Sequence, residues 1–257
     1  MIKVLFVGDV VGDAGCRCFK DSLAAMRNRH KIDAVIVNGE NSSSNNGLSL
    51  SSAEFLFSAG ADVITGGNHS FRCSDIYDSL DNNEFILRPA NYSRISPGHG
   101  TCVIDKLTYK ILVVNLSGRI YMDPVDDPFS AAKKIIEEHS DCAVKIIDFH
   151  AEATSEKAAL AHYLKGSVSA VLGTHTHVPT ADATILDGHT AFVSDVGMTG
   201  PVDSILGVET EIVLKKFTSG MPVRFKHKDG DCRFCGILLS IDEKTGKTAQ
   251  IEHINTI

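Results

Sequence analysis

The sequence has 257 residues, of which 43% are hydrophobic and 22% are charged, and its formal net charge is −7. This length can bury a sizeable core, and no segment has the roughly 20 apolar residues that a membrane-spanning helix requires. The negative charge argues against binding to extended nucleic acid, which depends on clustered Lys and Arg, so we expect neither a membrane nor extended nucleic acid as a partner.

The chain begins with an apolar, β-branched run that predicts a strand over residues 2–7. It lacks the basic start, the long apolar stretch and the cleavage site of a secretory signal. The seven cysteines are an odd number scattered along the chain, which favours reduced thiols over a disulfide framework. We therefore expect a cytoplasmic protein.

The first two thirds of the sequence alternate short apolar runs with amphipathic stretches, which is typical of an α/β fold. Helices are predicted over residues 15–29, 49–59, 128–139 and 155–164. Further strands are predicted over residues 34–37, 62–65, 101–104, 111–116, 144–149 and 170–172, with 101–104 and 111–116 antiparallel. The polar residues 41–47 predict a loop.

The last part of the chain has a different pattern of apolar and polar residues from the first two thirds. Residues 209–217 predict a helix, and residues 236–241 and 248–253 alternate around a turn, which is the pattern of a β-hairpin. The sequence has no obvious linker or internal repeat, so we expect one domain over residues 1–257. Its architecture should be a mixed sheet, or two packed sheets, flanked by helices.

Side chains that bind metals follow five of the predicted strands. They are Asp9, Glu40 with Asn41, Asn68 with His69, His150, and His175 with His177. The carboxyl ends of strands in an open sheet lie side by side, so these residues can converge on one site. Imidazole nitrogen together with carboxylate and amide oxygen suits Mn, Fe or Zn. A lone Asp or Asn after a strand is usually a helix cap or turn residue, but a two-metal site needs about this many ligands.

The ordered motifs resemble those of the calcineurin-like metallophosphoesterases, and the resemblance spans nearly the whole chain. The motifs are Gly8-Asp9, Gly39-Glu40-Asn41, Gly66-Gly67-Asn68-His69, His150 and Gly173-Thr-His-Thr-His-Val-Pro179. The Glu-Asn form, and the later Ser194-Asp-Val-Gly-Met-Thr-Gly-Pro201, resemble the bacterial YmdB-like branch. The resemblance implies an α/β fold of two packed mixed β-sheets flanked by helices.

The resemblance also implies which residues hold each metal ion. Asp9, Glu40, Asn41 and His177 would hold one ion, and Asn68, His150 and His175 would hold the other, with Glu40 bridging both. Two positions depart from the commonest pattern of the superfamily. Val11 stands where a ligand His is usual, and Glu40 replaces an Asp; the YmdB-like branch shares both changes. Iron and manganese are the expected metals, with zinc as an alternative.

The expected activity is that of a binuclear metal-dependent phosphodiesterase acting on small phosphate esters by attack of a metal-bridging hydroxide. The resemblance implies 2′,3′-cyclic nucleotides such as 2′,3′-cAMP as substrates. His69, next to the ligand Asn68, is the candidate catalytic residue outside the metal ligands, stabilising charge or protonating the leaving oxygen.

Two other functions stay open from sequence alone. One is a phosphomonoesterase that acts on nucleotides or phosphoproteins, and the other is a nucleotide-binding regulatory protein with incidental turnover. Substrate-binding residues are unassigned: Asn91, His99 and Asp195 are weak candidates, each more typical of a turn or loop. The resemblance is compatible with a homo-oligomer, but no sequence feature decides the oligomeric state.

Overall fold

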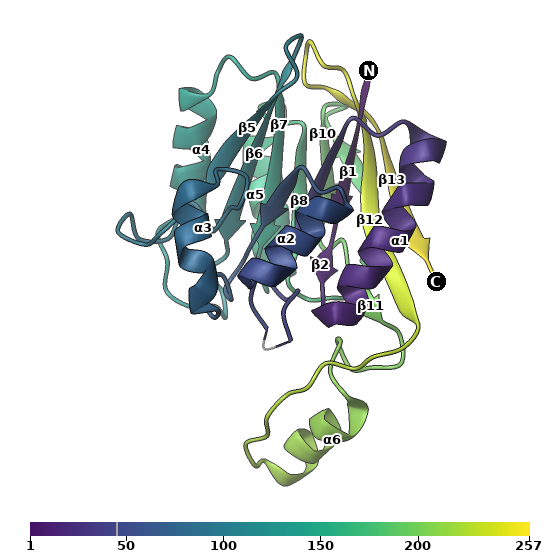
Figure 1. Ribbon diagram of the computed structural model, residues 1–257. Coiled ribbons are helices and arrows are strands. Elements are labelled where there is room, and N and C mark those ends of the chain that lie inside the picture. Colours follow the sequence, from purple (N-terminus) through teal and green to yellow (C-terminus); the bar gives the residue numbers. More distant parts are fainter. Residues whose placement is uncertain (45) are drawn as a thin grey trace.

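The computed structural model describes residues 1–44 and 46–257, and it contains two β-sheets packed face to face (Figure 1). The first sheet consists, in spatial order, of β2 (Asp9–Val10), β11 (Met198–Pro201), β12 (Cys232–Ile241), β1 (Ile2–Val7), β3 (Ala34–Asn38) and β4 (Val63–Thr65), with β13 (Thr248–Thr256) paired to β12. The second consists of β5 (Thr101–Asp105), β6 (Lys110–Ser117), β7 (Val144–His150), β8 (Ala170–Thr174), β10 (Thr190–Val193) and β9 (Thr184–Leu186).

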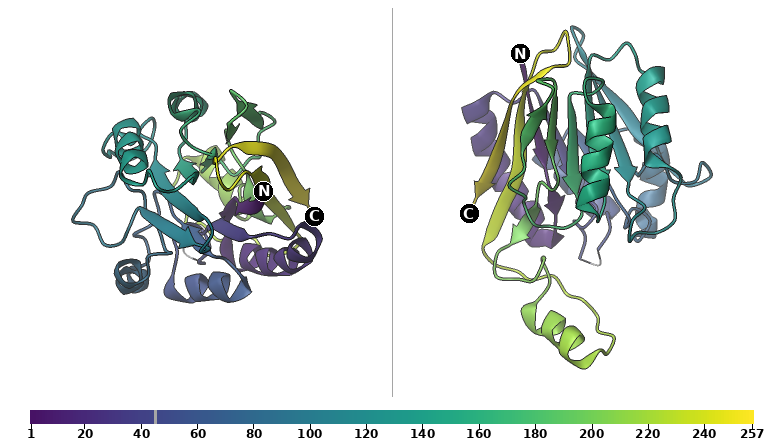
Figure 2. Two further views of the ribbon diagram at one scale, coloured as in Figure 1. Left: turned by 90° about the horizontal axis from the view of Figure 1, so that it is seen from above. Right: turned by 180° about the vertical axis from the view of Figure 1, so that it is seen from behind.

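Helices cover the outer face of each sheet, as the view from above makes clear (Figure 2). The first sheet is covered by α1 (Gly12–His30) and α2 (Leu50–Ala59), and the second by α4 (Pro128–Glu138) and α5 (Thr154–Leu164). The short helices η1 (Ser74–Ile76) and α3 (Tyr77–Asn82) follow β4, whereas α6 (Thr210–Ser219) protrudes from one end of the molecule. The predicted fold of two packed mixed sheets flanked by helices is therefore confirmed.

The apolar core has three layers because both faces of each central strand are covered. Along β1, Val4 and Phe6 face the space between the sheets, while Leu5 and Val7 pack against α1 and α2. Alternation of side chains along a strand produces this division. A strand that is buried on both faces has no polar side, which explains the continuous apolar runs in the sequence.

Side-chain caps mark where two of the covering helices, α2 and α4, begin. Ser49 caps α2: its hydroxyl accepts a hydrogen bond from the Ser52 backbone N–H, and Ser52 Oγ accepts one from the Ser49 backbone N–H. Asp127 caps α4 and Pro128 occupies its first turn. Such caps satisfy backbone groups that a helix leaves unpaired at its start. No helix in the described part of the chain is long and apolar enough to span a bilayer.

The parallel strands that carry the candidate residues end on the same side of the molecule. β1, β3 and β4 are parallel neighbours in the first sheet, and β7 and β8 are parallel neighbours in the second. The predicted antiparallel pairs β5 with β6 and β12 with β13 are confirmed. The strands β2, β9, β10 and β11 and the helices η1 and α3 were not predicted, and α1 begins at Gly12 rather than at residue 15.

Candidate metal centre

The seven candidate ligands converge between the two sheets in two groups that share Glu40. In one group, His150 Nε2 lies 3.1 Å from Glu40 Oε1, 3.1 Å from Asn68 Oδ1 and 3.0 Å from His175 Nδ1. A single ring nitrogen cannot form full hydrogen bonds with all three of these atoms. Their convergence is the geometry of donors arranged around a common point, and Glu40, His150 and His175 form a cluster that could hold a metal ion.

The other group contains Asp9, Asn41 and His177. His177 Nε2 lies 3.2 Å from Asn41 Nδ2 and 3.8 Å from Asp9 Oδ1, and Asn41 Nδ2 lies 3.1 Å from Glu40 Oε1. Asp9 is fully buried, and its Oδ1 has no hydrogen-bond partner among the described residues. A buried carboxylate oxygen without a partner is costly, and a cation at this position would satisfy it.

Each of the three candidate histidine ligands directs its outer ring nitrogen at an oxygen atom. His150 Nδ1 lies 2.9 Å from Thr174 Oγ1, and His175 Nε2 lies 3.0 Å from Glu152 Oε2. His177 Nδ1 lies 3.1 Å from the Leu206 carbonyl oxygen. Donation of the outer N–H leaves the lone pair of the inner nitrogen facing the other ligands, which is how histidine binds a metal ion. The residues present therefore fit a metal centre.

A buried polar network supports His150. The Thr174 hydroxyl, which accepts from His150 Nδ1, donates to Asp148 Oδ1 at 2.7 Å. The other oxygen of Asp148 accepts from the Thr65 hydroxyl and from Asn38 Nδ2. None of these residues is among the candidate ligands, and sequence analysis gave them no role. The Asp148-x-His150 spacing, which places both side chains on one face of β7, was the available signal.

The buried ionisable side chains of the site shift one another's pKa values. Burial lowers the pKa of His150, but Glu40 and Asp9 outweigh it and raise this pKa to about 9. Burial and the neighbouring His150 lower the pKa of His175 to about 3. Burial also raises the pKa of Asp9. For Glu40, burial acts to raise the pKa, but the neighbouring His150 and His69 outweigh it and bring this pKa below its ordinary value. Because this cluster joins buried carboxylates to imidazoles, a cation would stabilise both kinds of group.

Glycines allow the backbone to come close to these side chains. A Cβ atom on Gly67 would lie 2.1 Å from Glu40 Oε2, and one on Gly173 would lie 1.8 Å from the Ser194 carbonyl oxygen. His175 and His177 adopt positive φ angles of 103° and 65°, which cost free energy in residues with a side chain. The backbone N–H groups of His175 and Thr176 donate to Asp9 and Asp195 and hold this turn.

His69 lies at the edge of the cluster. Its backbone N–H donates to Glu40 Oε2 at 3.2 Å, and its Nδ1 lies 2.8 Å from Asn41 Oδ1. Burial lowers the pKa of His69, which favours the neutral ring. The oxygen and nitrogen of an amide exchange places when the group turns by 180°. Turning Asn41 in this way would direct its oxygen at His177 Nε2 and its N–H at His69 Nδ1.

Two of the weak candidates for substrate contact have structural roles instead. Asn91 is buried and donates to the Ser117 and Asp126 carbonyl oxygens. Asp195 is buried in an ion pair with Lys157, at 2.9 Å. His99 is exposed and lies beside the Asp81 carbonyl oxygen, 3.4 Å from its Nε2. These positions correct the idea that Asn91 and Asp195 face a substrate.

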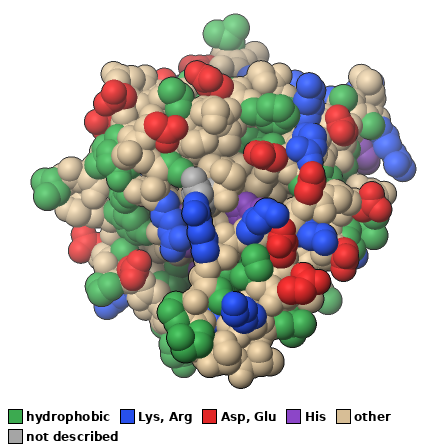
Figure 3. All heavy atoms as spheres, turned by 60° about the horizontal axis from the view of Figure 1, so that its bottom comes forward, with side chains coloured by type: hydrophobic (Ala, Val, Ile, Leu, Met, Phe, Trp, Pro, Cys, Tyr) green, Lys and Arg blue, Asp and Glu red, His purple; other side chains and the backbone are tan. Residues whose placement is uncertain are grey.

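A cavity of about 280 Å³ adjoins the candidate ligands. Its lining includes Glu40, Asn41, His69, His175 and His177, together with apolar side chains from residues 205–225. On this end of the molecule a histidine side chain is visible in a hollow that has Lys and Arg side chains on both sides (Figure 3). The cavity gives a substrate access to the candidate ligands.

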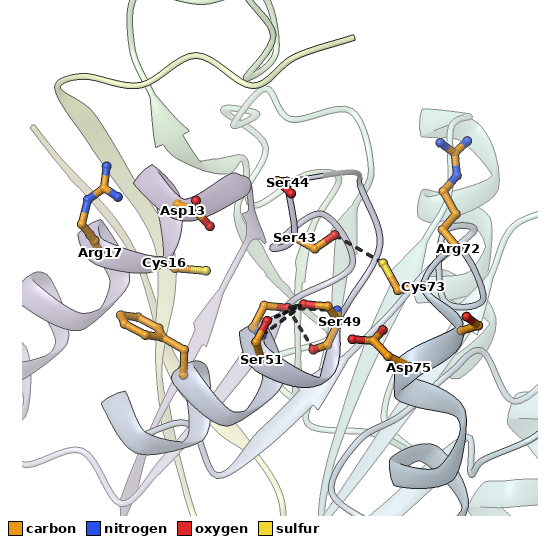
Figure 4. Close-up of a pocket in the computed structure, with 13 residues that line it drawn as sticks. Asp13, Cys16, Arg17, Ser43, Ser44, Ser49, Ser51, Arg72, Cys73 and Asp75 are labelled. Atoms are coloured by element: carbon orange, nitrogen blue, oxygen red, sulfur yellow. Dashed lines mark hydrogen bonds between the residues drawn. The ribbon is translucent and has the colours of Figure 1, made fainter. Parts of the chain in front are cut away.

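A larger cavity of about 840 Å³ lies between the beginning of α1, the beginning of α2 and the residues before η1 (Figure 4). Its lining is mostly polar and includes Arg17, Arg72, Ser43, Ser49 and Ser51. His69 and the seven candidate ligands lie outside this lining. The smaller cavity is therefore the candidate active site.

Comparison with known proteins places the chain among metallophosphoesterases. A family model described as YmdB-like protein matches residues 5–254. A Bacillus subtilis (strain 168) protein named 2′,3′-cyclic-nucleotide 2′-phosphodiesterase is 42% identical over 254 residues, which cover 98% of this chain and 96% of the relative.

Two solved structures share the fold over almost their whole length. A hypothetical protein from Thermus thermophilus has a TM-score of 0.93 and 42% identity, with 99% of each chain covered. A structure described as a novel phosphatase from Mycoplasma pneumoniae has a TM-score of 0.93 and 36% identity, with 99% of this chain and 93% of that chain covered. The resemblance found in the motifs is thus confirmed, and this chain belongs to the YmdB-like family of calcineurin-like metallophosphoesterases.

Proposed function

We propose that this protein is a phosphodiesterase that hydrolyses 2′,3′-cyclic nucleotides with two transition-metal ions. The observation that carries the proposal is the orientation of His150, His175 and His177, each of which directs its outer ring nitrogen at an oxygen and its inner nitrogen at the shared cluster. The substrate class is supported by the Bacillus subtilis relative, which is 42% identical and is named for this activity.

We assign the ligands in two sets. Asp9, Asn41 and His177 would hold one ion, Asn68, His150 and His175 would hold the other, and Glu40 would contribute to both. The mixture of imidazole nitrogen with carboxylate and amide oxygen favours iron or manganese. When bound, two such ions lower the pKa of a water molecule and neutralise the charge on phosphoryl oxygens.

The chain's own residues have three tasks in this reaction. Glu40 and Asp9 supply buried negative charge that holds the site together, and the Thr174 hydroxyl fixes the ring of His150. His69 lines the cavity and donates a hydrogen bond to the leaving 2′ oxygen, which stabilises the negative charge that develops there as the bond to phosphorus breaks, and water supplies the proton of the new 2′ hydroxyl. The product keeps the phosphate on the 3′ oxygen.

Asn41 links metal binding to this hydrogen bond. With its amide oxygen turned toward His177, its N–H group would face His69 Nδ1, which lies 2.8 Å from the amide in the structure. His69 Nδ1 would then accept a hydrogen bond, so the ring proton would reside on Nε2. In this tautomer the neutral ring can donate a hydrogen bond from Nε2 into the cavity, in line with its lowered pKa.

The first test is hydrolysis of 2′,3′-cAMP by protein stripped of metal and then reloaded with Mn²⁺, with Asp9→Ala as the control. We expect metal to restore turnover in the natural protein and not in the variant. Binding of two ions without cleavage of the cyclic nucleotide would overturn the diester assignment while leaving the metal centre in place. Parallel assays with 3′-AMP would then measure the monoesterase activity suggested by the Mycoplasma pneumoniae structure.

A further inference from the structure

The protruding segment of residues 202–228 is closed at its base by contacts between its own two ends. Val208 pairs with Ile205 and with His227, and the backbone N–H groups of Glu209 and Lys228 donate to the Lys226 and Gly207 carbonyl oxygens. Between these ties the chain forms α6, which extends beyond the ends of both sheets in two views (Figures 1 and 2). The base of this segment also supplies the Leu206 carbonyl oxygen that lies 3.1 Å from His177 Nδ1.

Apolar side chains of this segment line the same cavity as the candidate ligands. Val213 and Phe217 are four residues apart on α6, so they lie on one face of the helix, and Leu206 and Phe225 join them in lining the cavity. Phe217 is 79% exposed and Phe225 is 40% exposed. Large apolar side chains that gather in a cavity with a few polar groups are typical of a ligand-binding site.

We infer that this apolar wall is the binding subsite for the nucleobase, and that Phe225 and Phe217 determine the preference for nucleotides over other phosphodiesters. The inference rests on the proposed function, because it takes the phosphate to lie at the metal centre in the same cavity. A base is flat, aromatic and largely apolar on its faces, so it can stack on phenyl rings. Lys216 Nζ lies 4.7 Å from the centre of the Phe225 ring, a cation–π contact that helps to fix the ring.

The polarity of the cavity walls favours this orientation of the substrate. The part of the lining at the strand ends carries Glu40, Asn41 and three histidines, while the part that comes from residues 205–225 is wholly apolar. A nucleotide has the same division, because its phosphate is charged and the faces of its base are largely apolar. The larger cavity beside α2 is lined mainly by serines and charged groups and lacks the metal-centre residues, so it is the less suitable place for a base attached to a phosphate under hydrolysis.

The test compares two cyclic phosphates that differ only in the base: 2′,3′-cAMP and the 2′,3′-cyclic phosphate of methyl riboside. We expect Phe225→Ala, in Mn²⁺-loaded protein, to lower kcat/KM for 2′,3′-cAMP roughly 5- to 150-fold through KM, because stacking on one aromatic side chain contributes about this much. The substrate without a base should be unaffected. Leu214→Ala is the matched control, since Leu214 lies on α6 and is 52% exposed but does not line the cavity.

A binding measurement keeps this inference separate from the proposed function. Calorimetric titration with 3′-AMP and with methyl riboside 3-phosphate compares the same pair of ligands without turnover. Tighter binding of 3′-AMP that is lost in Phe225→Ala would support the base subsite even if the cyclic diester were not hydrolysed. Equal loss for both ligands, or no loss for either, would overturn the subsite. Phe217→Ala could instead lower the mass of the protein in light scattering and leave the affinity for 3′-AMP unchanged. The apolar wall would then be a contact surface for a second copy of the chain, and this result too would overturn the subsite.

Discussion

Gly67 lies so close to Glu40 that a Cβ atom at position 67 would be 2.1 Å from Glu40 Oε2. The same atom would be 2.3 Å from His150 Cδ2. A methyl group must therefore displace two of the proposed metal ligands at once. The absence of a side chain at this position is a requirement of the site itself, because the backbone after β4 passes directly against the ligands.

Gly67→Ala should therefore remove metal and activity while the protein stays folded. We expect elemental analysis of the purified variant to show loss of at least one ion, and turnover of 2′,3′-cAMP to fall to background, with an unchanged far-UV circular dichroism spectrum. Gly166→Ala is the control. Gly166 has a positive φ of 79° but no atom near an added Cβ, so this change costs roughly 1–2 kcal/mol of backbone strain and leaves the site intact. Full metal content in Gly67→Ala would contradict the role given to Glu40 and His150.

The hydroxyl of Thr174 connects His150 to the buried Asp148. Thr174→Val keeps the shape of the side chain but removes the acceptor for His150 Nδ1. Loss of such a supporting contact typically weakens metal affinity 10- to 100-fold, and we expect this effect in titrations of the metal-free protein with Mn²⁺. Thr65→Val is the matched control because the Thr65 hydroxyl also donates to Asp148 but does not contact His150. Equal losses in the two variants would mean that Asp148, and not the orientation of His150, sets the affinity.

The sequence was sufficient to predict the strand ends and the residues that follow them. Each central strand is buried on both faces, so it reads as an unbroken apolar run, and the polar residues after it stand out. Asp9 follows β1 of the first sheet and His177 follows β8 of the second, so they converge because the two packed sheets end these strands on the same side of the molecule.

Other elements and residues could not be predicted from the sequence, because no pattern of apolar and polar residues marks them. β11 contains Gly200 and Pro201 and pairs with β2 over only two positions, so neither periodicity nor propensity marks it as a strand. Asp148 and Thr174 lie inside buried strands, where a polar residue is unexpected and only the tertiary structure shows its partner. The start of α1 at Gly12 was missed because glycine disfavours helix and Val11 supplies no side-chain cap.

His69→Ala tests whether His69 stabilises the leaving oxygen. We expect the variant to retain its metal ions, because the backbone N–H of residue 69 still reaches Glu40, and to lose about 100- to 1,000-fold in turnover of 2′,3′-cAMP. Bis(p-nitrophenyl) phosphate has a leaving group that is a stable anion and needs little stabilisation, so its hydrolysis should fall much less. His99→Ala replaces an exposed histidine and should change neither reaction. A similar loss with both substrates would exclude stabilisation of the leaving oxygen and leave His69 a role in positioning.

Lys157 and Asp195 form a buried ion pair behind the turn that carries His175 and His177. The side chains are 2% and 1% exposed, and Asp195 also accepts hydrogen bonds from the backbone N–H groups of Thr176 and Gly197. Removing one partner of such a pair leaves an uncompensated buried charge, which typically costs about 3–5 kcal/mol.

Lys157→Met should therefore lower the free energy of unfolding by about this amount in urea titrations, with a smaller loss when Asp195→Asn is added, because the second change removes the unpaired charge. The double variant keeps an amide that can bond to the turn, so its Mn²⁺ affinity should lie above that of Lys157→Met alone. If the single and double variants were equally destabilised, the loss would come from the packing of the Lys157 side chain, and the ion pair would have no separate part in holding the His175–His177 turn.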